Sequence, residues 1–310
     1  MSIMSKLKTF RSILRNQNYY YKVGINKSHD VAELIRYTHS MEKGLCISNP
    51  KLGYGHEKQE HMLTLLSKLK DEKSVAATEA KNMAVMSLRR YLEYHDAKNY
   101  SDAMIEKIKG ALADYPETSC CYGGTVEINK SDLKFNTEEI ERFFNTRHSI
   151  RDFEKTPVNE EDLKKALVLA QRAPSACNRQ GYRAYVLNHD QSLQYAKKLA
   201  GIGGFAEDVG RFIMITGKLS AYREDEINQY IVSASMYAAY LTLTLHLYGI
   251  GACVVQRPVF YTKEWNNLRN KFSIPADEQI ICLLAIGNLK DKMTVPMSYR
   301  LDQEALFKLF

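Results

Sequence analysis

The chain has 310 residues, of which 45% are hydrophobic and 25% charged, a composition that excludes a disordered or fibrous protein. Its length allows one large domain or two domains of modest size. The net charge is +7, but residues 1–28 hold six basic residues and no acid, so the remainder is close to neutral. We predict no nucleic-acid partner.

The amino-terminal segment, residues 1–28, predicts a basic amphipathic helix. Ile3, Leu7, Phe10 and Leu14 recur at helical spacing, and lysines and arginines occupy much of the remaining surface. We expect first that this apolar stripe packs on the protein's own core. The alternatives are contact with an anionic membrane surface and an organellar transit peptide.

Helical patterns then continue to about residue 115. They run from His29 to Lys73, with a break at residues 48–55, then from Ala76 to His95 and from Asp102 to Tyr115. The eight histidines and six cysteines show no metal-ligand spacing, so we predict no metal site and a reducing, cytoplasmic environment. The sequence therefore predicts a helical region over residues 1–137.

The second half, residues 138–310, alternates helix and strand. Strands are predicted at residues 184–187, 212–216, 252–256 and 280–286, with helices at residues 138–146, 160–172, 191–199 and 228–248. The last of these helices is too short and too polar to span a membrane, and we expect it to be buried on all sides. The pattern is α+β, with one sheet packed between helices.

Two polar segments in this half predict a binding site. Arg147, Ser149 and Arg151 alternate, so an extended chain places two guanidiniums and a hydroxyl on one side. Guanidinium offers forked donors that match phosphate oxygens two at a time. After Pro174 ends a helix, Ser175, Asn178 and Gln180 supply uncharged hydrogen-bonding groups that can read the edge of a flat heterocycle.

The order and spacing of these two segments resemble the nitroreductase family of flavoproteins, over residues 147–306. The resemblance implies a central, mostly antiparallel sheet flanked by helices, a homodimer whose partner subunit completes the FMN site, and NAD(P)H as co-substrate. The first segment would grip the FMN phosphate and ribityl chain, and the second would line the isoalloxazine ring. Residues 296–300 resemble a further sequence motif of the family. The FMN-binding residues so implied are Arg147, His148, Ser149, Arg151, Pro174, Ser175, Asn178, Gln180, Val255, Gln256 and Arg300.

The function implied is an FMN-dependent NAD(P)H oxidoreductase that reduces a nitro, quinone or related acceptor. No side chain is assigned a catalytic role, because the flavin carries the chemistry. Gly181 and Tyr182 stand where many family members have proline and tryptophan, so we expect a looser wall beside the ring. Flavin cleavage and reductive dehalogenation remain alternatives.

A different class of function is also open. Residues 39–45 resemble a short sequence motif found in nitroreductase-like proteins associated with surface-polysaccharide synthesis. A flavin-binding or degenerate accessory protein, held at a membrane through residues 1–28, is therefore a further alternative. His39 and Glu42 of this phrase could share a helical face, either as an acid–base pair or as a structural contact.

Overall fold

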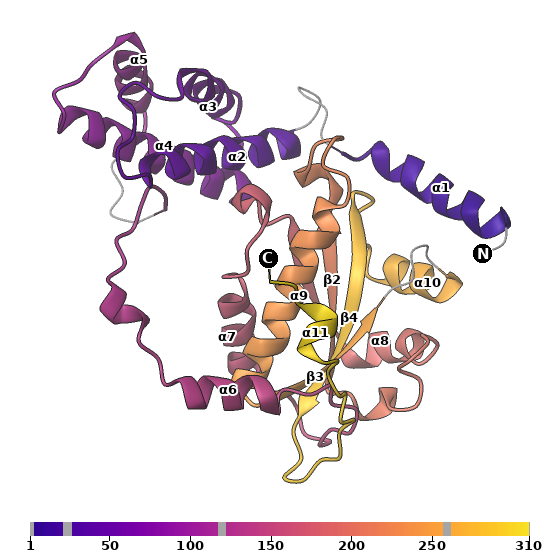
Figure 1. Cartoon of the computed structure of the whole chain (residues 1–310). Coiled ribbons are helices and arrows are strands. Elements are labelled where there is room, and N and C mark those ends of the chain that lie inside the picture. Colours follow the sequence, from indigo (N-terminus) through magenta and orange to yellow (C-terminus); the bar gives the residue numbers. More distant parts are fainter. Residues whose placement is uncertain (1–2, 21–26, 117–121, 257–261, 310) are drawn as a thin grey trace.

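The computed structural model describes residues 3–20, 27–116, 122–256 and 262–309 (Figure 1). A helical amino-terminal region leads through an extended connection into a domain built on one sheet. The helices of the first region are α1 (Ile3–Gln17), α2 (Lys27–Leu45), α3 (His56–Lys68), α4 (Val75–Asp96) and α5 (Ala103–Leu112). The predicted helices and the break after residue 47 are confirmed.

Helices α2 to α5 enclose a hydrophobic core of their own. Leu34, Met62, Leu88, Tyr91 and Ile105 come from four different helices and are completely buried in it. His95 is buried beside Tyr91, and its two ring nitrogens bond to the Tyr91 carbonyl and the Gly53 N–H. This histidine therefore serves the structure of the helical region.

The amino-terminal region also packs against the sheet domain. Tyr20 and Ala32 share a buried cluster with Tyr222 and Tyr230, and the Lys218 ammonium donates to the Ser28 hydroxyl at 2.7 Å. Residues 122–136 then cross to the far side of the sheet domain and enter α6 (Thr137–Thr146), a helix without a buried residue.

The sheet has four strands in the order β1-β2-β4-β3, and every neighbouring pair is antiparallel. The strands are β1 (Tyr182–Leu187), β2 (Arg211–Lys218), β3 (Ile250–Gln256) and β4 (Glu278–Asn288). Strands β2 and β4 are buried along almost their whole length, because helices cover both faces of the sheet. A parallel bridge between Ser149 and Ala252 extends the sheet beyond β3. The α+β prediction is confirmed.

Two helical layers cover the sheet. Helices α7 (Glu160–Ala170) and α9 (Gln229–Leu247) contribute to the core on one face, while α10 (Lys263–Lys271) and the residues after α8 (His189–Ala196) contribute to the other. Asn159 caps α7 by accepting from the Glu161 and Asp162 N–H groups, as predicted. No helix among the described residues is long and apolar enough to cross a membrane.

Two helices are less buried within a single chain than their sequences predict. Helix α9 is not buried on all sides: Val232, Met236 and Tyr240, one turn apart, lie on an exposed face. The apolar stripe of α1 does not pack on the protein's own core either, and it stays exposed at the edge of the molecule (Figure 1). The carboxy-terminal arm with α11 (Gln303–Leu306) is exposed over residues 296–309.

Candidate functional site

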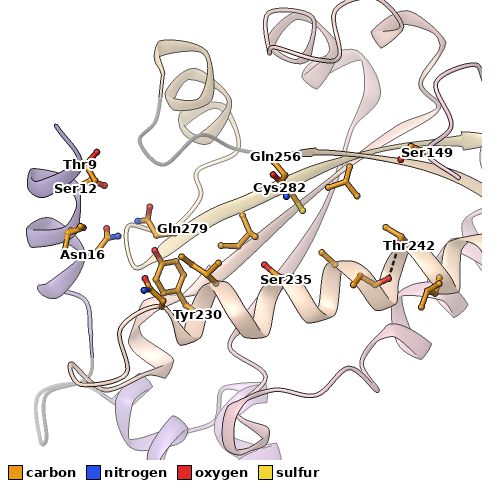
Figure 2. Close-up of a pocket in the computed structure, with 18 of the residues that line it drawn as sticks. Thr9, Ser12, Asn16, Ser149, Tyr230, Ser235, Thr242, Gln256, Gln279 and Cys282 are labelled. Atoms are coloured by element: carbon orange, nitrogen blue, oxygen red, sulfur yellow. Dashed lines mark hydrogen bonds between the residues drawn. The ribbon is translucent and has the colours of Figure 1, made fainter. Parts of the chain in front are cut away.

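A cavity of about 790 Å³ lies between α9, the edge of the sheet formed by β3 and β4, and helix α1 (Figure 2). Ser149 and Thr242 lie at one end of it, and Thr9, Ser12 and Asn16 of α1 lie at the other. Among the described residues that line the cavity, Arg147 is the one that carries a charge. The described lining of the cavity is thus uncharged except for one cation at one end.

The fold positions the segment that carries this cation. Thr146, at the end of α6, shares a hydrogen bond of 3.0 Å with the Nε2 atom of His246 on α9. Ile150 donates its N–H to the Ala252 carbonyl at 3.0 Å and buries its side chain in the core. Because side chains alternate along an extended segment, burying Ile150 turns Ser149 to the opposite side. Burial first, and the nearby Arg147 charge second, lower the pKa of His246.

Only part of the predicted phosphate-binding segment, Arg147 to Arg151, reaches the cavity. Arg147 and Ser149 line the cavity, and the Arg147 side chain has no hydrogen bond or ion pair with another described residue. Arg151 is not a lining residue, and its guanidinium donates to the Ser149 carbonyl at 3.4 Å. His148 borders only a separate space of about 40 Å³, which is too small for a cofactor. Of this segment, Arg147 and Ser149 therefore offer one guanidinium and one hydroxyl to an anion in the cavity.

Strand β3 contributes its last residues. Val254 and Gln256 line the cavity, whereas Val255 between them is buried in the core on the other face of the sheet. Of the two residues predicted here, Gln256 can offer its side chain and Val255 only its backbone. Arg300 lies in the exposed carboxy-terminal arm and is not among the residues that line the cavity.

The second predicted segment does not reach this cavity in the same chain. Ser175 accepts the Gln180 N–H at 3.0 Å through its hydroxyl, and its carbonyl accepts the Asn178 N–H at 2.9 Å. The Gln180 side chain turns back to Asn178 and borders a different cavity, of about 350 Å³, against α2. Neither Pro174 nor any of these three residues lines the larger cavity.

Helix α9 separates the two segments. The Ala176 N–H donates to the Ser233 hydroxyl at 3.3 Å, so the loop packs on the face of α9 that carries Ser233. Ser235 lines the large cavity, and two residues along a helix differ by about 200° around its axis. The two segments therefore lie on opposite sides of α9 and do not meet within one chain.

The loop itself holds an unusual backbone. Cys177, Asn178 and Gln180 all have positive φ, near 50°, although none is glycine. Such residues cost of order 1–3 kcal/mol each and persist only where the surroundings fix them, which they do most often at binding and active sites. This strain is a reason to keep the loop in the candidate site.

Arg179, which no sequence pattern singled out, fixes this loop. Its side chain is 1% exposed and forms a two-pronged pair with Glu226, at 2.5 and 2.6 Å. The same guanidinium donates to the Ala176 and Ala221 carbonyls and stacks on the Tyr222 ring. Arg179 and Glu226 are 47 residues apart, so no local pattern could have linked them.

The space beside Gly181 is filled by neighbouring side chains rather than open. A Cβ atom at this position would lie 2.6 Å from the Tyr222 hydroxyl and 2.9 Å from the Ala221 Cβ atom. Tyr222 is completely buried, so it occupies the space beside the loop. The expectation that glycine loosens this wall is therefore wrong.

Gly181→Ala is expected to destabilise the protein by roughly 1–3 kcal/mol, because overpacking forces neighbouring side chains to move. Gly110→Ala is the matched control: it lies in α5 with no atom within 4 Å of the added methyl, and alanine favours a helix. Thermal unfolding of both variants measures the difference. Equal melting temperatures for the two would contradict the packing described.

The predicted pair of His39 and Glu42 can also be placed. His39 and Glu42 do form a pair at 3.3 Å, and the other Glu42 oxygen accepts from the Ser87 hydroxyl and the Gly124 N–H. Glu42 therefore ties α2 to α4 and to the connection, which is a structural contact. The described residues contain no group of three or more metal-ligating side chains.

The two polar segments fall within the part of the chain that matches a known protein family. Residues 145–207 match the model of the Nitroreductase family. A protein of Archaeoglobus fulgidus, provisionally named NADH dehydrogenase/NAD(P)H nitroreductase, is 27% identical over 158 residues, which are 50% of this chain and 88% of that protein.

An FMN-dependent nitroreductase from Clostridium difficile shares 24% identity, covers 54% of this chain and 98% of its own, and has a TM-score of 0.46. A nitroreductase-like protein from Streptococcus mutans shares 17% identity, covers 56% and 100% of the two chains, and has a TM-score of 0.49. The residues that match the family model include both polar segments. In its carboxy-terminal half, the chain therefore carries a segment that matches the Nitroreductase family, and it is similar to a relative that bears that name.

Proposed function

We propose that this protein is an FMN-dependent oxidoreductase that uses NAD(P)H to reduce an uncharged acceptor, such as a nitro compound or a quinone. The observation that carries the proposal is the Arg147 guanidinium at one end of a large cavity: it forms no hydrogen bond or ion pair with another described residue, and the other described lining residues are uncharged. The family match and the name of the Archaeoglobus relative support the same class of chemistry.

The residues of the cavity fit FMN. Its volume, about 790 Å³, lies in the range of cofactor sites. Arg147 and Ser149 suit a phosphate, which needs forked donors and a hydroxyl. Between the two ends, Ala238, Ala239 and Ile281 offer apolar surface to a flat ring, and Gln256 offers a polar group at its edge.

Bound FMN would supply the chemistry of hydride transfer between NAD(P)H and the second substrate. Arg147 then neutralises the phosphate, and the helices around the cavity shield the ring from water. The end lined by Asn16, Tyr230 and Gln279 carries no charged side chain among the described residues. We therefore expect acceptors without a formal charge to be preferred there.

The proposed enzyme is a homodimer that forms each flavin site from two chains. The phosphate segment and the loop at residues 174–180 lie on opposite sides of α9, so one chain cannot supply both. An apolar stripe of Val232, Met236 and Tyr240 lies exposed on α9. Pairing of this stripe with that of a second copy would bury it, as obligate dimers do. It would bring the partner subunit's loop toward Arg147.

Met236→Asp is expected to dissociate this dimer, weakening association at least about 100-fold, because an unpaired carboxylate in an apolar interface costs several kcal/mol. Light scattering after size-exclusion chromatography measures the mass, and flavin absorbance measures retention of the cofactor. Both should fall together, since the site needs both copies. Val75→Asp, at an exposed valine of α4, is the control and should leave both unchanged.

The function is tested most directly by the purified protein's flavin absorbance and by NAD(P)H oxidation with a quinone or nitroaromatic acceptor. A protein that neither binds added FMN nor quenches its fluorescence would overturn the proposal. Tight FMN binding without NAD(P)H oxidation by any acceptor would favour the accessory function in polysaccharide synthesis instead.

A further inference from the structure

Helix α1 turns an apolar face away from the rest of the chain. Ile3, Leu7, Phe10 and Leu14 are 79%, 49%, 58% and 51% exposed. Their spacing of i, i+4, i+7 and i+11 places them in one stripe along the helix. A soluble helix normally buries such a stripe against its own domain, but no part of the chain that the structure describes covers this one.

The opposite face of α1 is polar and faces the domain. Thr9, Ser12 and Asn16 line the large cavity, and Figure 2 shows them on the side of α1 toward the sheet. Each follows a residue of the apolar stripe by two positions, which is about 200° around a helix. Helix α1 therefore turns its polar face toward the domain and its apolar face away, which is the reverse of a helix that packs on its own core.

Basic residues flank the exposed stripe. Lys6 precedes Leu7, while Arg11 and Arg15 follow Phe10 and Leu14, so the charges lie about 100° to either side of the stripe. All three side chains are exposed, and none forms an ion pair with another described residue. Residues 1–28 contain no acid.

We propose that α1 docks this protein on an anionic membrane surface. The stripe enters the boundary between headgroups and acyl chains, and the flanking lysine and arginines reach anionic headgroups, as in interfacial helices. Tyr20, immediately after α1, is almost completely buried beside Tyr230, which holds the helix to the domain. Docking would therefore bring the α1 end of the cavity within about one helix diameter, ~10 Å, of the lipid.

Charge favours the membrane over a second copy as the occupant of this stripe. Nearly all of the net charge of +7 lies in residues 1–28, so the remainder of a second copy offers this basic helix little opposite charge, and the second copy's own amino-terminal segment has the same sign. An anionic bilayer offers the opposite sign. It also accepts a protruding ridge of side chains without a complementary groove. The exposed stripe of α9, which has no flanking lysine or arginine over residues 229–247, has the character of a protein interface instead.

The test is flotation of the full-length protein with vesicles of phosphatidylcholine alone or with 30% phosphatidylglycerol. We expect binding to the anionic vesicles that weakens in 0.5 M salt. The triple variant Lys6→Gln, Arg11→Gln, Arg15→Gln should lower partitioning about 100-fold, at roughly fivefold for each charge. Leu7→Ser with Phe10→Ser should lower it at least about tenfold.

The matched controls change the same residue types elsewhere. The triple variant Lys51→Gln, Lys58→Gln, Lys68→Gln removes three exposed charges from the helical region, and Val75→Ser removes an exposed apolar side chain. Both should float like the wild type. Absence of binding to anionic vesicles, or equal losses in the α1 and control variants, would overturn the proposal. So would Leu7→Ser with Phe10→Ser converting a dimer to a monomer without any vesicle binding, because a second copy would then cover the stripe. The readout is independent of flavin binding and of activity.

Discussion

Arg147→Ala is expected to raise the dissociation constant for FMN roughly 100-fold, because truncating one partner of a buried charge pair costs about 2–5 kcal/mol. Arg147 is the charged side chain that the described residues turn into the cavity, and no carboxylate among them neutralises it. Fluorescence quenching of added flavin measures the constant. Arg147→Lys should lose less, because it keeps the charge but not the forked donors.

Riboflavin separates the phosphate from the ring in this experiment. It lacks the phosphate, so the wild type should bind it far more weakly than FMN, and Arg147→Ala should bind the two flavins about equally. Arg142→Ala, an exposed arginine on the preceding helix, controls for loss of positive charge. If Arg147→Ala still preferred FMN as strongly as the wild type, the phosphate site would lie elsewhere. Ser149→Ala should have a smaller effect, since it removes a single hydroxyl.

Arg179→Ala is expected to destabilise the protein by about 3 kcal/mol, because it leaves Glu226 without its partner in a largely buried pair. The melting temperature should fall by roughly 5–10 °C, which calorimetry would measure. The loop at residues 174–180 should also lose its strained backbone, because Arg179 holds the Ala176 and Ala221 carbonyls. Flavin affinity should fall with it in the dimer.

The control for this variant is Arg172→Ala, an exposed arginine just before the loop, which should change stability by less than about 0.5 kcal/mol. A double-mutant cycle with Glu226→Gln isolates the pair. If Arg179→Ala were as stable as Arg172→Ala, the pair would not be what holds the loop.

Stability of the pair should also depend on pH. Burial acts to raise the pKa of Glu226, but the hydrogen bonds from Arg179 and from the Arg223 N–H outweigh it and leave the pKa below its usual value. The folded state thus binds this proton less readily than the unfolded state. The contribution of Glu226 is therefore complete above the unfolded pKa of about 4.3 and is lost as the pH falls through the folded pKa.

The measurement is the difference in melting temperature between the wild type and Glu226→Gln. It should be constant from about pH 8 to pH 5 and shrink below about pH 4. A difference that grew on acidification would show that the carboxylate is not stabilised by Arg179.

Local patterns determined much of this protein. The helical region, the four strands, the Asn159 cap and the segment with Arg147 and Ser149 follow from periodicity and residue chemistry within short windows. Such features depend on neighbours along the chain, so the sequence shows them directly. The same reasoning selected Ser175, Asn178 and Gln180, and backbone strain marks Asn178 and Gln180 in the structure as well.

Tertiary structure alone decided how these pieces are arranged. Only packing shows that the phosphate segment and the strained loop lie on opposite sides of α9, that Arg179 pairs with Glu226, and that α1 presents its polar face to the domain. The reason is physical: a helix fixes which residues share a face, but the partner of that face is chosen by contacts between residues far apart in sequence. Periodicity identified the stripes of α1 and α9, and the fold decided that both remain uncovered within one chain.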